Sequence, residues 1–130
     1  MKTIYNYKYY IFFLILMLSF IPASVSGGAK RILKVTATAY NSVPSQTDSI
    51  PDIAAWGDKL VPGMKAIAVS LDLLSKGLSH GTKVKIAGMQ GTYIVLDKMN
   101  KRWRRKIDIY MGVDIKAAKE WGKREVRIQW

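Results

Sequence analysis

Apolar and β-branched residues alternate with polar residues in several short runs along the chain. The first run begins at Ile32 (ILKVTATAYN), and others follow in KAIAVSLD (65–72), KVKIAGMQGTYIVLD (83–97), KIDIYM (106–111) and REVRIQW (124–130). A period of two in runs of this length is typical of β-strands. The glycines between residues 88 and 91 predict a hairpin turn inside the third run. We therefore expect about six short strands.

Three other stretches depart from the strand pattern. VDIKAAKEWGK (113–123) has helical spacing, with Asp114 placed as the N-cap and Gly122 as the C-cap. One helical turn and a tight turn are expected in LLSKGLSHGT (73–82), and a long irregular loop in SVPSQTDSIPDIAAWGDKLVPG (42–63). The fold class is predicted as mainly β: a small six-stranded barrel with one short helix near the C-terminus. Closure into a barrel removes exposed strand edges.

The first 27 residues have the pattern of a secretory signal peptide. Lys2 and Lys8 precede an apolar run at 11–21, which Pro22 and several small residues follow. The apolar run is about half of the roughly 20 residues that a membrane-spanning helix needs. We expect a protein exported to the periplasm or outside the cell and associated with the envelope, with one domain at 28–130. An uncleaved membrane anchor is the alternative.

The composition narrows the partners of that domain. Residues 28–130 hold 19 of the cations and all nine acids, a formal charge of +10. Such a charge concentrates a protein near polyanions. An exported protein meets anionic envelope polymers first, so no nucleic-acid partner is expected. The chain has no cysteine, so sheet closure and packing must hold a domain that we expect to be a monomer.

Few residue types remain that could carry chemistry. His80 is the single histidine and lies in a polar turn, and no spacing typical of metal ligands occurs, so neither a metal nor another cofactor is expected. Asp72, Asp97 and Asp108 each lie at the end of, or inside, a β-branched run, where Asp is disfavoured. An acid in that position either binds backbone amides or faces a cleft.

The fragments that contain these acids occur in a recognisable order. They are ATAY (37–40), IAVSLD (67–72), HGTKVKI (80–86), YIVLD (93–97), KIDIYMG (106–112) and EWGKREVRI (120–128). Together they resemble the three-aspartate (3D) domain, a double-psi β-barrel named for three recurring acids. The resemblance covers the chain from about Val35 to Trp130, and Asp72, Asp97 and Asp108 fall on the three acids.

This resemblance implies an activity. Similar barrels form the catalytic part of membrane-bound lytic transglycosylases and occur in expansin-like wall proteins. In the transglycosylases the acid of the Ile-Asp-Ile-Tyr strand is catalytic, and Asp108 holds that position. The implied reaction is a lyase-type cleavage of MurNAc–GlcNAc bonds in peptidoglycan, in which one carboxyl acts as acid and then as base. Asp97, as a nearby like charge, would keep Asp108 protonated. Asp72 is the third implied site acid.

The resemblance also implies a rim that contacts the glycan. Tyr40, Thr47 and Lys98 are the expected substrate contacts, and Trp103, flanked by cations, is expected to be exposed and to stack on a sugar ring.

The connection between Asp97 and Asp108 departs from the family pattern. KMNKRWRRK (98–106) stands where the family has a glycine-rich segment. Its six cations predict a lowered pKa for Asp108. The main alternative function is therefore a non-catalytic barrel that binds wall carbohydrate or anionic polymer. A nucleic-acid module, suggested by KRWRR, is disfavoured by the export signal.

Overall fold

A computed structural model describes residues 27–43 and 52–130 of the chain. The strands are β1 (Ile32–Tyr40), β2 (Ala66–Val69), β3 (Lys83–Ile86), β4 (Tyr93–Lys98), β5 (Lys106–Tyr110) and β6 (Arg124–Gln129). Two short helices are present in the described part, α2 (Leu71–Leu74) and α3 (Ile115–Trp121). The predicted mainly β fold is confirmed. Residues 1–26 of the predicted signal peptide lie outside the described residues.

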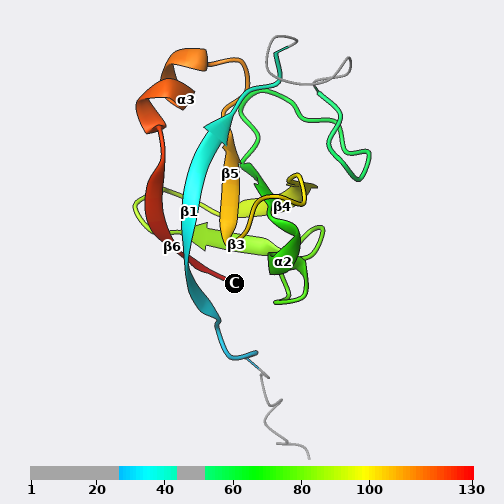
Figure 1. The fold of residues 1–130 in the computed structure, drawn as a ribbon, viewed down its shortest axis with the longest axis vertical. Helices are drawn as coiled ribbons and strands as arrows, with labels where there is room; N and C mark the ends of the chain where they lie inside the picture. Colours follow the sequence, from blue (N-terminus) through cyan, green and yellow to red (C-terminus); the bar gives the residue numbers. More distant parts are fainter. Residues whose placement is uncertain (1–26, 44–51) are drawn as a thin grey trace, which may run out of the picture.

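The six strands close into a barrel in the order β1–β5–β2–β4–β3–β6 (Figure 1). The β1–β5 and β2–β4 pairs are parallel, and the other four pairs are antiparallel. Strands β3 and β4 form the predicted hairpin. Closure pairs both edges of every strand, which satisfies backbone groups that an open sheet would leave exposed.

The hydrophobic core fills the barrel interior. Strands β3 and β6 alternate between buried and exposed residues, whereas all four residues of β2 are buried. Strand β5 is also covered on both faces, apart from the half-buried Asp108. Because β2 and β5 are neighbours in the barrel, their double burial makes this pair the most enclosed part of the sheet.

Part of the long loop predicted at 42–63 packs against the outside of the barrel. Ala54 and Leu60 are buried together with Ala66 and Tyr110 in a second, small apolar cluster. A β-bridge between Ile53 and Lys59 closes this section on itself. Residues 44–51, which include Thr47, lie outside the described residues. The described part of the loop is therefore held by packing, although it contains no strand or helix.

The helix caps of α3 agree with the prediction. The Asp114 carboxylate accepts a hydrogen bond from the Ala117 backbone N–H at 2.9 Å, and Gly122 ends the helix with a φ of 64°. That φ is in the left-handed region that glycine adopts without a steric cost. Figure 1 shows α3 at one end of the barrel, beyond the end of β1.

The strand predicted across 65–72 extends too far. Strand β2 ends at Val69, Ser70 becomes the N-cap of α2, and Asp72 lies in the first turn of that helix. Serine is a favoured N-cap residue. The turn also buries Leu73 completely. No helix in the part of the chain that the structure describes is long and apolar enough to cross a membrane.

Candidate functional site

The register of four neighbouring strands brings two of the predicted acids together. Thr38 on β1 is the partner of Asp108 on β5, and Asp108 is in turn the partner of Ala68 on β2. Ala68 is also the partner of Asp97 on β4. The two carboxylates therefore flank one alanine in a single row across the sheet, with a threonine at the end of the row.

A register shift in the β2–β4 pair creates this row. Ile67 is opposite Val95, but the next residue, Ala68, is opposite Asp97. In a regular pair Ala68 would face Leu96 instead. Such bulges re-aim side chains and are frequent next to functional sites. Because Ala68 has only a methyl group, the space between the two acids remains open.

An open hollow of about 170 Å³ lies over this row. It brings together five of the seven predicted site residues, and it is lined by Tyr40, Ala68, Asp97, Lys98, Met99, Asn100, Trp103 and Asp108. Ligand pockets commonly measure about 300–1,000 Å³. A smaller, open hollow suits one bond of a polymer that lies across the surface better than a small molecule that must be enclosed.

Asp97 is held by three hydrogen bonds. Its Oδ1 accepts from the backbone N–H groups of Ala55 at 2.7 Å and Lys98 at 2.9 Å. Its Oδ2 accepts from the Tyr40 hydroxyl at 3.3 Å. Burial and the negative charge of Asp97 raise the pKa of Tyr40 above its ordinary value, so this phenol stays a proton donor. Asp97 thus joins the 52–63 loop to the barrel and orients Tyr40.

Asp108 has the properties of an acid that is protonated more readily than usual. Burial raises its pKa, and the negative charge of Asp97 raises it further. A hydrogen bond of 2.9 Å from the Thr38 hydroxyl to Oδ1 and the positive charge of Lys106 lower the pKa, but burial prevails and the net shift is upward. The charge of Asp97 thus acts in the predicted direction, but burial is the main cause of the raised pKa of Asp108.

The lowered pKa that the six cations predicted for Asp108 is wrong. Five of these cations are exposed, Lys98 at the end of β4 and the other four on the connection between β4 and β5. Only Lys106 lies on the same face of β5 as Asp108, two residues away, where it is 9% exposed. Water screens exposed charges, whereas burial penalises the ionised carboxylate directly. Desolvation therefore outweighs the local positive charge.

Trp103 lines the hollow, and the buried Lys106 packs against its ring. The Lys106 ammonium nitrogen is 3.6 Å from the centroid of the Trp103 ring, and the Arg102 guanidinium carbon is 4.9 Å from it. Both distances fit cation–π contacts. Trp103 is 37% exposed, as predicted. Sequence reasoning missed the placement of Lys106, although the alternation of β5 puts it on the face of Asp108.

Asp72 lies apart from the hollow. Its Oδ2 and Oδ1 accept from the Arg105 backbone N–H at 3.1 and 3.3 Å. Burial acts to raise the pKa of Asp72, but hydrogen bonds from the Ser70 hydroxyl and the Arg105 N–H lower it, and the net shift is downward. Arg105 has a φ of 46°, an uncommon value for a residue with a side chain. Asp72 therefore anchors the turn that leads into β5.

An aromatic and charged cluster continues the rim beyond Asp97. Trp56 packs against the core, and the centroid of its ring is 5.1 Å from the centroid of the His80 ring. His80 Nε2 is 2.6 Å from Asp58 Oδ2, and the Lys98 ammonium nitrogen is 5.5 Å from the Trp56 ring. These contacts fix the 52–63 loop beside the hollow.

Within residues 27–43 and 52–130, no group of three or more His, Asp or Glu side chains is arranged to hold a metal ion. No protein-family model matches the chain, and a search of curated proteins finds no significant relative.

Proposed function

We propose that this chain is a double-psi barrel of the three-aspartate kind that cleaves the MurNAc–GlcNAc bonds of peptidoglycan as a lytic transglycosylase. The observation that carries the proposal is the environment of Asp108: a half-buried carboxyl with a raised pKa, beside Asp97, at the floor of an open hollow. The two parallel strand pairs within a six-stranded closed barrel support the double-psi assignment.

The first chemical step needs a proton donor. Protonated Asp108 transfers its proton to the oxygen between the two sugars as the bond from that oxygen to C1 of MurNAc breaks. Positive charge develops on the sugar ring during this step. The Asp97 carboxylate, which accepts three hydrogen bonds, supplies a negative charge on the same rim. The leaving GlcNAc keeps the proton on its new hydroxyl.

The second step returns the proton to Asp108. The Asp108 carboxylate, stabilised by the Thr38 hydroxyl and the Lys106 ammonium group, accepts the proton of the MurNAc C6 hydroxyl. The C6 oxygen then bonds to C1 and forms a 1,6-anhydro ring. No water is consumed, and the carboxyl is restored. One carboxyl thus serves as acid and base, so a second catalytic carboxylate at the spacing of a hydrolase is not required.

The neighbouring side chains have supporting roles. Tyr40 lines the hollow as a hydroxyl donor, and its high pKa keeps it neutral. Lys98 and Trp103 contribute a cation and an aromatic surface at the rim, where the glycan would lie. A sugar ring presents C–H groups to an aromatic face, which favours Trp103 as a contact for the glycan.

The second candidate is a non-catalytic barrel that binds the same glycan. The observation that favours it is the full set of hydrogen bonds on Asp97, which is also typical of an acid that only ties a loop to a barrel. Both candidates predict binding to peptidoglycan. They differ in whether any glycan bond breaks.

The test is the release of soluble fragments from purified peptidoglycan by the full chain. Asp108→Asn removes the proton donor and should slow release by at least about 100-fold, the usual contribution of a general acid. Glu120→Gln, an exposed change on α3 that also removes one acid, is the matched control and should leave the rate unchanged. Binding without release by the wild-type protein would favour the non-catalytic barrel.

A further inference from the structure

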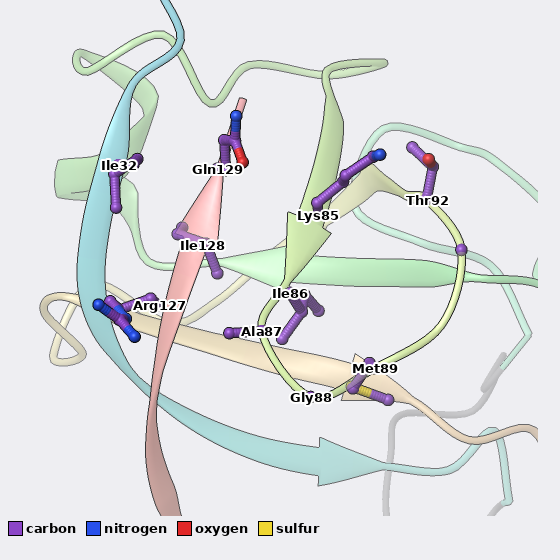
Figure 2. Close-up of a pocket in the computed structure, with 11 residues that line it drawn as sticks. Ile32, Lys85, Ile86, Ala87, Gly88, Met89, Thr92, Arg127, Ile128 and Gln129 are labelled. Carbon is purple, nitrogen blue, oxygen red and sulfur yellow. The ribbon is translucent and has the colours of Figure 1, made fainter.

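A larger open cavity lies away from the Asp108 hollow. It measures about 540 Å³ and lies between β3, β6 and the hairpin loop at 87–92. Figure 2 shows Lys85 on β3 and Arg127 on β6 beside it. Ile32 lines this cavity and Tyr40 lines the Asp108 hollow, so the two sites lie at opposite ends of β1. An extended strand of this length measures roughly 26 Å.

Two further hollows, of about 370 and 270 Å³, adjoin this cavity. The hollow of about 370 Å³ shares Ile32 with the cavity, and the hollow of about 270 Å³ shares Lys85 with it. Trp130 lines both hollows. Together, the three hollows form what we call the basic groove. No described Asp or Glu lines any of them, but six cations do: Lys30, Arg31, Lys76, Lys83, Lys85 and Arg127.

The sheet register concentrates positive charge in the basic groove. Arg127 on β6 is directly opposite Lys34 on β1, which lies outside the groove lining and forms an ion pair with Glu125. Lys83 and Lys85 extend from the same face of β3, roughly 7 Å apart along the strand. Like charges opposite each other destabilise a strand pair. Among the described residues, no acid compensates Arg127, Lys83 or Lys85.

The remaining lining indicates the class of ligand. The cavity of about 540 Å³ offers the Thr92 hydroxyl, the Gln129 amide and the backbone of Gly88 and Gly91, all of which can donate hydrogen bonds to oxygen atoms. No aromatic side chain lines it in the described part of the chain, and the two adjoining hollows have one, Trp130. Proteins that hold single-stranded nucleic acid stack the bases on aromatic rings. The lining therefore suits phosphates and hydroxyls better than bases.

We propose that the basic groove binds an extended anionic polymer in which phosphate groups are joined by polyols. Bound there, the polymer would dock the domain on the envelope and leave the Asp108 hollow free for the glycan at the other end of β1. The proposal rests on the predicted export, because the protein would meet such a polymer in the cell envelope. It does not depend on the activity of Asp108.

Binding of the full chain to labelled poly(glycerol phosphate), followed by fluorescence anisotropy at several salt concentrations, tests this proposal. Lys85→Gln with Arg127→Gln removes two groove cations whose side chains make no described hydrogen bond or ion pair. The dissociation constant should rise at least tenfold. The slope of its logarithm against the logarithm of salt concentration should fall by about two, because about two fewer counterions are released. Lys119→Gln with Lys123→Gln removes equal charge beside α3 and should change the dissociation constant less than threefold.

Three results would overturn the proposal. Equal weakening of binding by the groove double variant and the control double variant would mean that net charge alone drives binding. A larger loss from Lys101→Gln with Arg102→Gln would move the site to the β4–β5 connection. Tighter binding of single-stranded DNA than of poly(glycerol phosphate) would assign a different polymer. Asp108→Asn should bind the polymer as the wild type does, whether or not it has lost cleavage, so failure of this proposal is distinguishable from failure of the proposed activity.

Discussion

The hydrogen bond from Thr38 to Asp108 offers a sharp perturbation of the site. The Thr38 hydroxyl donates to Asp108 Oδ1 at 2.9 Å and is one of the two influences that lower the pKa of this carboxyl. Thr38→Val keeps the shape of the side chain and removes the donor. The pKa of Asp108 should rise further, because burial and the charge of Asp97 then act against Lys106 alone.

The size of the effect depends on the protonation state of Asp108. A hydrogen bond to an ionised group contributes about 1.5–3 kcal/mol to stability, and one between neutral groups about 0.5–1.5 kcal/mol. Above the pKa of Asp108, Thr38→Val should therefore lower the free energy of unfolding by about 2 kcal/mol. Once the carboxyl is protonated, the loss should shrink to about 1 kcal/mol.

Two assays follow the change. Urea unfolding across pH gives the stability difference, and the pH dependence of fragment release gives the protonation of the acid. Because the acid must be protonated, the alkaline limb of the rate profile should move to higher pH in Thr38→Val. Thr38→Ser, which keeps the hydroxyl, is the control. A stability loss that is equal at all pH values, or an alkaline limb that moves to lower pH, would refute this account of Asp108.

Three further changes test other parts of the site. Asp108→Asn should raise the free energy of unfolding at neutral pH, because a raised pKa in the folded state makes the ionised carboxylate costly to bury. The gain should vanish below pH 3.8, the ordinary pKa of an Asp carboxyl. Urea unfolding that shows no such gain would contradict the argument from burial. Asp72→Asn should cost about 1 kcal/mol at neutral pH by loosening the Arg105 turn. The Asp72 pKa is lowered, so this cost should disappear as pH falls through the carboxyl range. A loss of stability in Asp72→Asn that is the same at all pH values would contradict the role of the Asp72 carboxylate in the Arg105 turn. Ala68→Val should fill the space between Asp97 and Asp108 and abolish fragment release without changing the far-ultraviolet circular dichroism spectrum; full release would mean that the glycan does not use the hollow.

Local patterns predicted most of the secondary structure. The alternation in KVKI and REVRIQ gave β3 and β6 because one face of each strand is buried. Asp114 and Gly122 marked the ends of α3 because capping depends on neighbouring backbone groups, which a sequence contains. The strand signal of AIAV continued too far because Ser70 and the burial of Leu73 begin a helix instead.

The candidate site could be predicted only in part. Asp97, Asp108, Tyr40, Lys98 and Trp103 meet at one hollow. The bulge that aligns Asp97 with Ala68 arises from pairing between strands β2 and β4, so the sequence of neither strand alone reveals it. The pKa of Asp108 was mispredicted because a count of nearby cations omits desolvation. Asp72 was predicted as a site acid but anchors a turn, since it lies in the first turn of α2 and accepts from the Arg105 backbone N–H.

The chemistry of the cleaved ends tests the central claim most directly. Purified peptidoglycan is digested by the full chain in heavy-oxygen water, and the fragments are analysed by mass spectrometry. Transfer to the MurNAc C6 hydroxyl predicts 1,6-anhydro ends that contain no heavy oxygen, and none of these ends with Asp108→Asn. Hydrated ends that carry heavy oxygen, or no cleaved ends from folded wild-type protein, would contradict the account.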